Sequence, residues 1–317
     1  MKEIKVACRC LCFFILGLRW PCRSDIRRRT TCRKDFTKWA LHRVSVIRRA
    51  VFLLYARYDF SLSRSGLSLG LLLFCNLLHS AEATIAVAAN FRETAQEIAQ
   101  RLESTSPHRF TIISGSTGKL VSQALYGAPF DVVMAADEAR PLKLIDEGLA
   151  TMNARRTYAL GEVGLWWPGK TPPFGIIELN ELSPRSVCLA NPALAPYGAA
   201  AWSLLEQSGL DVEWLAGGVR VDNVNLVAGM VAQKQSRAGF VARASIAAMM
   251  RKGDLALDDQ SILWLSSEAA IQQDLVLMKR AEDNPAAQWW VEQLFEAPIQ
   301  HLLKSHGYQL PKEEHSQ

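Results

Sequence analysis

Four short polar or glycine-containing segments each follow a predicted β-strand and begin a predicted helix. They are Ala89-Asn90, Gly115-Ser116-Thr117-Gly118, Pro196-Tyr197-Gly198 and Asp222-Asn223-Val224. The first amide groups of a helix have no intrahelical partner, and the helix dipole places partial positive charge at the same end. Several such helix ends, brought together, would form a site for a dianion that is held by neutral donors.

Side chains in these segments could add hydrogen bonds to an ionised oxygen. We expect the Asn90 NH2 group and the hydroxyls of Ser116 and Thr117 to donate, and each such bond is worth about 1.5 to 3 kcal/mol net. The same residue types most often act as helix caps, and so does Asp222 in the usual interpretation. Four such segments at corresponding strand ends favour a ligand site, because ligands of open α/β sheets bind outside the carboxyl ends of strands.

The elements that must position these segments alternate between strands and helices from residue 84 onwards, which is typical of an α/β fold. Strands are predicted at residues 84–88, 110–113, 131–135, 158–167, 186–190, 219–221, 239–241 and 275–279. Helices are predicted at residues 91–102, 118–126, 140–147, 198–208, 224–235, 285–295 and 297–306.

The length of this alternating region suits two lobes with a ligand cleft between them. We expect the chain to cross from one lobe to the other near residues 162 and 267. Lobe I would then contain residues 84–162 and 268–317, and lobe II residues 163–267.

Charge separates the N-terminal part of the chain from the rest. Residues 1–65 contain 16 Lys and Arg against 4 Asp and Glu, whereas residues 84–317 contain 20 against 26. The later part is therefore acidic, and no nucleic-acid partner is expected for it. Residues 1–60 are predicted to be a basic extension. It is either an over-extended start of translation or an arm that binds anionic membrane surfaces.

A cleavable secretory signal peptide is predicted over residues 61–83. Arg64 precedes an apolar run at residues 67–78, and Ala81-Glu82-Ala83 supplies the small residues of a cleavage site. The apolar run is shorter than the roughly 20 residues that a membrane-spanning helix needs. We therefore expect cleavage after Ala83 and a periplasmic mature protein.

A series of motifs occurs in order along residues 84–311. They are Val87-Ala88-Ala89-Asn90-Phe91, Ser114-Gly115-Ser116-Thr117-Gly118-Lys119-Leu120, Gly127-Ala128-Pro129-Phe130-Asp131-Val132, Ala135-Ala136-Asp137, Asn191-Pro192, Ala195-Pro196-Tyr197-Gly198, Asp222-Asn223-Val224, Ala238-Gly239-Phe240-Val241-Ala242 and Gln272-Gln273-Asp274. Together they resemble the molybdate-binding proteins of ABC importers. The resemblance implies a type II periplasmic-binding fold, in which each lobe is a mixed sheet flanked by helices and the ligand lies in the interlobe cleft.

The same resemblance implies a function and a set of site residues. The protein would bind molybdate or tungstate and deliver it to the membrane subunits of an ABC permease. Carried over by position, the oxyanion contacts fall on Asn90, on Ser116 or Thr117, on Tyr197, and on Val224 through its backbone. The metal would be held through its oxygens, with no direct metal-ligating residue. We expect a monomer without a cofactor or catalytic activity.

Two alternatives stay open. The chain could bind another oxyanion such as sulfate or phosphate, or it could be an enzyme on the same fold. An enzyme would need a base or nucleophile near the cleft, and Asp222 is the one acid in the four segments. Elsewhere, Cys188 is interpreted as a buried structural thiol. His301 and His306 are five residues apart, a spacing that does not suit a metal pair, and are predicted to be solvated.

Overall fold

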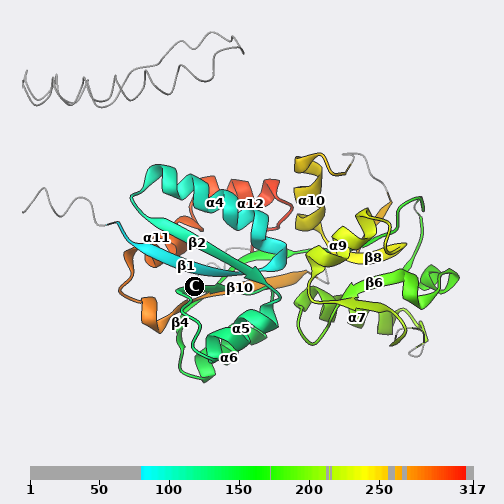
Figure 1. Ribbon diagram of the computed structural model, residues 1–317, viewed down its shortest axis with the longest axis horizontal. Coiled ribbons are helices and arrows are strands. Elements are labelled where there is room, and N and C mark those ends of the chain that lie inside the picture. Colours follow the sequence, from blue (N-terminus) through cyan, green and yellow to red (C-terminus); the bar gives the residue numbers. More distant parts are fainter. Residues whose placement is uncertain are drawn as a thin grey trace, which may run out of the picture. The chain divides into compact units, whose positions relative to one another are not determined.

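The structure is a computed structural model that describes residues 80–171, 173–211, 214, 216–255, 261–265 and 270–311. The predicted basic extension and nearly all of the predicted signal peptide lie outside these described residues. Two five-stranded sheets form the framework, with strand orders β2-β1-β3-β10-β4 and β7-β6-β8-β5-β9 (Figure 1). None of the described helices is both long enough and apolar enough to cross a lipid bilayer.

The first sheet and its helices form what we call the first lobe. Its strands are β1 (Glu82–Ala88), β2 (Arg109–Gly115), β3 (Val132–Met134), β4 (Ala150–Gly161) and β10 (Ile271–Met278). Strand β1 is parallel to β2 and β3, whereas β10 is antiparallel to β3 and β4. One face is covered by α4 (Arg92–Thr105), α11 (Pro285–Gln293) and α12 (Ala297–Ser305), and the other by α5 (Thr117–Leu125) and α6 (Ala139–Asp146) (Figure 1).

Alternation along β1 explains how the first sheet is held between two helix layers. Successive side chains of a strand point to opposite faces. Ile85 therefore packs with Phe91 and Trp290 under α4 and α11. Its neighbour Ala86 packs with Leu144 on the face that carries α5 and α6. The predicted strand at residues 84–88 thus forms the centre of two hydrophobic cores.

The second sheet and its helices form the second lobe. Its strands are β5 (Val163–Trp166), β6 (Val187–Ala190), β7 (Val219–Val221), β8 (Ala238–Ala242) and β9 (Ile262–Trp264). Strand β6 is parallel to β7 and β8, and β5 is antiparallel to β8 and β9. Helix α7 (Pro196–Gln207) packs on one face, and α9 (Val224–Ala232) and α10 (Arg243–Lys252) on the other (Figure 1). The prediction of two mixed sheets flanked by helices is confirmed.

The main differences from the sequence prediction concern α10, β9 and β4. Helix α10 and strand β9 were not predicted, and β4 begins at Ala150 rather than near residue 158. The part of β4 before Tyr158 carries Asn153, Arg155 and Arg156, so it lacks a clear apolar alternation. Helix α10 begins at Arg243, and its N-cap residue Ala242 has no side chain that could cap it, so the helix has no polar start signal. The predicted lobe boundary near residue 267 falls outside the described residues, and the lobe boundaries stay predictions.

Candidate functional site

A small cavity lies among the first residues of four helices. Its lining consists of Ala88, Ala89, Asn90, Ser116, Thr117, Ala136, Ala195, Pro196, Tyr197, Asn223 and Val224. The cavity volume is about 10 Å³, which is roughly the space for one water molecule. The structure therefore brings together all five residues that the sequence predicts as ligand contacts. Three of them come from the first lobe and two from the second.

The hydroxyl of Ser116 is buried without a partner. Ser116 occupies the N-cap position of α5, yet its side chain makes no capping hydrogen bond. The residue is 3% exposed, and its Oγ has no hydrogen-bond partner among the described residues. Leaving a buried hydroxyl unpaired costs about 1 to 3 kcal/mol. Because the Ser116 hydroxyl lies unpaired on the lining of a cavity, it is better suited to bind a ligand than to cap α5.

Thr117 contributes a second hydroxyl on the same lining. Its Oγ1 accepts a hydrogen bond from the Ala136 amide at 3.3 Å, and the side chain is almost completely buried. Because a hydroxyl can accept and donate at once, the Thr117 proton remains available. Thr117 is also the first residue of α5, where the amide has no intrahelical partner.

The amide of Val224 begins α9 on the second lobe. The Asn223 side chain caps this helix by accepting from the amides of Asn225 and Leu226 at 3.1 and 3.2 Å. The cap leaves out the Val224 amide, which is the first of the helix and has no partner within it. The positive end of the α9 dipole adds to its attraction for an anion.

Tyr197 presents a phenol that stays protonated. Its Oη accepts from Gln273 Nε2 at 3.2 Å. Burial, and then the neighbouring Tyr308 phenol, raise the pKa of Tyr197 well above its ordinary value. The hydroxyl is therefore a donor at any physiological pH. Gly198 lets α7 begin this close to β6, because a Cβ there would lie 2.2 Å from the Ala190 carbonyl oxygen.

Asn90 lines the cavity, but its NH2 group is not directed as the sequence suggests. Its Nδ2 donates to Gln273 Oε1 at 2.9 Å and to Tyr308 Oη at 3.2 Å. The expected side-chain donor is thus occupied by other protein groups. These partners lie 183 and 218 residues away in the sequence, so no local motif could have indicated them. What remains at Asn90 is its amide, near the start of the short helix η1 (Ala89–Phe91).

None of the described residues that line this cavity carries a charge. The nearby Lys119 of α5 forms an ion pair with Asp222, which precedes α9. Asp222 does not cap α9, because Asn223 fills that role. The described residues also contain no group of three His, Cys, Asp or Glu side chains that could hold a metal ion.

Hydrogen bonds join the two lobes on either side of the cavity. The Gly118 amide of α5 donates to the Leu194 carbonyl at 2.9 Å. On the other side, Asn225 Nδ2 donates to the Ala89 carbonyl at 2.5 Å. Each bond joins one lobe to the other beside the predicted contacts. The two lobes are therefore in a closed arrangement around the site.

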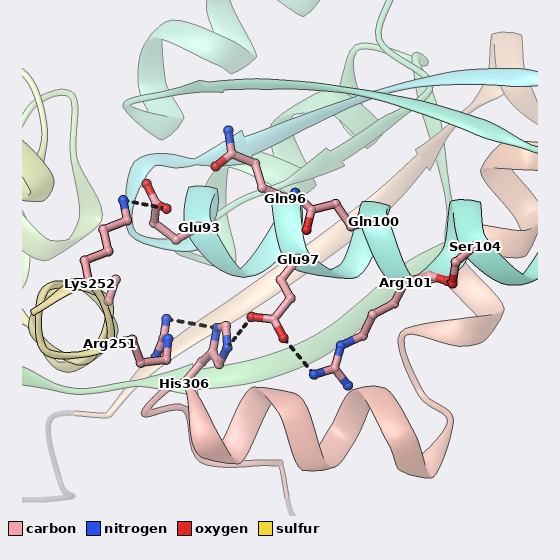
Figure 2. Close-up of a pocket in the computed structure, with 10 residues that line it drawn as sticks. Glu93, Gln96, Glu97, Gln100, Arg101, Ser104, Arg251, Lys252 and His306 are labelled. Atoms are coloured by element: carbon pink, nitrogen blue, oxygen red, sulfur yellow. Dashed lines mark hydrogen bonds and ion pairs between the residues drawn. The ribbon is translucent and has the colours of Figure 1, made fainter. Parts of the chain in front are cut away.

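A larger cavity of about 510 Å³ lies between α4, α10 and the turn after α12 (Figure 2). Most of its charged side chains are paired with one another. Glu97 contacts Arg101 at 2.7 Å and His306 at 3.1 Å, and Lys252 pairs with Glu93 at 2.7 Å. Four of its charged side chains are thus engaged with one another, and none of the residues predicted as ligand contacts lies on its lining, so this cavity is a poorer candidate for the anion site than the smaller one.

The prediction that His306 is solvated is wrong. His306 is 2% exposed, and its Nδ1 lies 2.9 Å from Thr94 Oγ1. The same Nδ1 lies 3.2 Å from an Arg251 nitrogen (Figure 2). Helices α4 and α10 bury this side chain, and the spacing of residues within α12 does not indicate which other helices pack against it. His301 is exposed, as predicted, and Cys188 is a buried free thiol, as predicted.

The sequence matches a known family over most of its length. Residues 83–309 match the family described as bacterial extracellular solute-binding protein. The chain is 34% identical over 254 residues to the molybdate-binding protein ModA of Azotobacter vinelandii, covering 80% of this chain and 99% of that protein. It is 29% identical over 232 residues to ModA of Rhodobacter capsulatus, covering 72% of this chain and 88% of that protein.

Structural similarity leads to the same family. The periplasmic molybdate-binding protein of Azotobacter vinelandii superimposes with a TM-score of 0.66 and 29% identity, covering 73% of this chain and all (100%) of that one. The chain belongs to the bacterial extracellular solute-binding protein family. Its resemblance to molybdate-binding proteins, which the motifs of the sequence indicate, is confirmed by these relatives.

Proposed function

We propose that the chain is the substrate-binding component of an ABC importer for molybdate or tungstate. The observation that carries this proposal is the buried, unpaired hydroxyl of Ser116 on a cavity whose described lining has no charged side chain. The names of the relatives support molybdate as the ligand.

The proposed binding mode uses neutral donors from both lobes. The hydroxyls of Ser116 and Thr117 and the phenol of Tyr197 donate to the ion, together with the Val224 amide and the amide at Asn90. The positive ends of the helix dipoles add attraction without a counter-charge. A lining of alanine and proline around these donors excludes water, which strengthens each charge-assisted hydrogen bond.

Transport requires that the lobes separate to admit the ion. In this closed arrangement the cavity is far smaller than a tetrahedral oxyanion, so the walls of the cavity must also adjust on binding. Closure of the lobes around the ion stabilises the closed state through contacts that only the bound form makes. The permease membrane subunits would recognise that closed form.

The proposal includes export to the periplasm by the predicted signal peptide and a monomeric protein without a cofactor. The periplasmic relative supports the location. A binding role is favoured over catalysis because Tyr197 is the one titratable side chain on the described lining, and its raised pKa keeps it protonated. A catalytic base is thus lacking among these residues.

Phosphate fits the lining less well than a fully ionised dianion. Near neutral pH phosphate carries a proton that needs an acceptor, and no carboxylate belongs to the described lining. Sulfate shares the charge and the tetrahedral shape of molybdate, so it is the closer competitor.

Calorimetric titration with molybdate, tungstate, sulfate and phosphate tests this function. We expect molybdate and tungstate to bind with a stoichiometry of one, sulfate to bind much more weakly, and phosphate to give no measurable heat of binding. If neither molybdate nor tungstate binds, the proposal is wrong. Tighter binding of sulfate would change the assigned ligand.

A further inference from the structure

We propose that Gln273 is a positioning residue that directs the Tyr197 O–H into the anion site. This inference rests on the proposed function. Gln273 belongs to β10 of the first lobe, is 0% exposed, and is not one of the residues that line the cavity. Its amide nevertheless bonds to Asn90 of the same lobe and to Tyr197 of the second lobe.

The direction of these hydrogen bonds is set at Tyr308. The Tyr308 hydroxyl lies 2.9 Å from the carbonyl oxygen of Asn90, and a carbonyl can only accept. The single hydroxyl proton of Tyr308 is therefore used in this bond. At the Asn90 side chain, 3.2 Å away, Tyr308 Oη can then only accept, so the Asn90 NH2 group must face it.

The orientation of the Asn90 NH2 group fixes the orientation of the Gln273 amide, and that amide fixes the hydrogen bond at Tyr197. The Asn90 NH2 group also lies 2.9 Å from Gln273, whose oxygen must therefore point toward Asn90. The nitrogen of Gln273 then faces Tyr197 Oη at 3.2 Å and donates to it. Asn90 Nδ2, 3.5 Å from Tyr197 Oη, cannot accept a proton either, because it belongs to an NH2 group whose two protons face Tyr308 and Gln273. Because both neighbouring nitrogens belong to amide NH2 groups, the Tyr197 proton has no protein acceptor among these contacts and is left for the ligand.

Gly161 makes this arrangement sterically possible. It ends β4, and a Cβ at this position would lie 2.0 Å from Tyr197 Oη and 2.5 Å from Gln273 Nε2. Any other residue would force the two groups apart. The backbone of β4 thus leaves just enough space for the Gln273 amide to meet the Tyr197 hydroxyl.

Gln273→Glu tests the inference because it replaces the donor by an acceptor of the same shape. An ionised Glu would accept the Tyr197 proton and turn it away from the ligand. We expect molybdate affinity to fall about 10- to 100-fold at pH 8. The affinity should recover as the pH is lowered and the carboxyl is protonated, with proton uptake on binding, measured by calorimetry in buffers of different ionisation enthalpy.

A double-mutant cycle with Tyr197→Phe separates positioning from a general effect of charge. If Gln273 acts through the Tyr197 hydroxyl, Gln273→Glu should weaken binding much less when it is combined with Tyr197→Phe than when it is made alone. Equal losses with and without Tyr197→Phe would overturn the inference. Gln123→Glu, on the exposed side of α5, is the control for added charge and should leave affinity unchanged.

Two further variants cover the case in which Gln273→Glu does not fold. Gln273→Leu removes the donor without adding a charge, and its smaller loss of affinity should also disappear when Tyr197→Phe is present. Gly161→Ala should weaken binding by displacing Tyr197, with both side chains unchanged. If the wild-type protein binds molybdate but neither variant changes affinity, this inference fails and the proposed function stands. If the wild-type protein does not bind, the function itself is wrong.

Discussion

Lys119 and Asp222 form an ion pair that joins the two lobes beside the anion site. Lys119 lies in the first turn of α5 and Asp222 immediately precedes the N-cap of α9, and both side chains are about half exposed at 48% and 52%. The lysine is thus neutralised by a carboxylate of the opposite lobe. The Lys119–Asp222 pair is placed to stabilise the closed form. It does not supply a counter-charge for the ligand, because the carboxylate already neutralises the ammonium group.

Lys119→Met should therefore have a small effect on affinity. Exposed ion pairs contribute about 0 to 1 kcal/mol, so we expect Kd to rise by less than about fivefold. Most of the change should be faster dissociation, measured by stopped-flow fluorescence. A loss of more than a hundredfold would mean that the ammonium group binds the ion directly.

Ser116→Ala should separate ligand affinity from stability. Removing an unpaired buried hydroxyl should leave the free energy of unfolding of the ligand-free protein unchanged or slightly higher. Molybdate affinity should fall by about 1.5 to 3 kcal/mol, because a charge-assisted hydrogen bond is lost. Urea denaturation and calorimetry measure the two quantities.

The exposed neighbour Ser114, on β2, supplies the control for this variant. Ser114→Ala should change neither quantity. If Ser116→Ala destabilises the ligand-free protein and leaves affinity intact, Ser116 has a structural role in place of the one assigned.

Val224→Pro should remove a single backbone donor. Proline is well tolerated at the first position of a helix, since that amide has no intrahelical partner, and the preceding Asn223 has the extended backbone that proline favours. We expect a loss of affinity of about tenfold or more with helix α9 intact. Val224→Ala keeps the amide and serves as the comparison, so equal affinities of the two variants would contradict a role for the Val224 N–H.

The sequence places Ser116, Thr117 and Val224 at helix starts because the signal for a helix start is local. Each lies where a strand gives way to a helix, and helix starts are recognisable from short patterns. Gln273 and Tyr308 carry no such signal, since they act through residues that are far away in the chain. The engagement of the Asn90 NH2 group was missed for the same reason.

The environment of His306 is a second feature that the sequence does not predict. The sequence places it at the end of a helix, but its environment is made by Thr94 and Glu97 of α4 and by Arg251 of α10. Periodicity within one helix indicates which residues share a face. It does not indicate which other helix covers that face.

Stability should decrease on acidification because of His306. Burial, and then the Arg251 guanidinium, lower its pKa below the ordinary value of 6.5, although Glu97 opposes the shift. As the pH falls through about 6.5, the unfolded chain therefore takes up a proton that the folded protein does not, and the free energy of unfolding decreases. His306→Gln should make this decrease smaller between pH 7.5 and 5.5, as measured by urea denaturation.

The exposed His301 of the same helix provides the matched control, and His301→Gln should retain the wild-type pH dependence. A His306→Gln variant whose stability falls as steeply as that of the wild type would show that other groups cause the loss.

Cys188 should be unreactive in the folded protein. Burial raises the pKa of its thiol to about 11, and Sγ lies 3.6 Å from the sulfur of Met230. Since the thiolate is the reactive form, alkylation at pH 8 should be on the order of a hundredfold slower than in urea. Mass spectrometry of the peptide that contains Cys188 measures both rates, and equal rates would contradict the buried site.

The most direct test of a dianion held by neutral donors is a crystal structure with tungstate, in which anomalous scattering locates the metal. We predict tungsten in the cavity between the lobes, with its oxygens within hydrogen-bonding distance of Ser116, Thr117, Tyr197 and the Val224 amide, and no Lys or Arg in contact. Tungsten found elsewhere, or bound by a cationic side chain, would contradict the account.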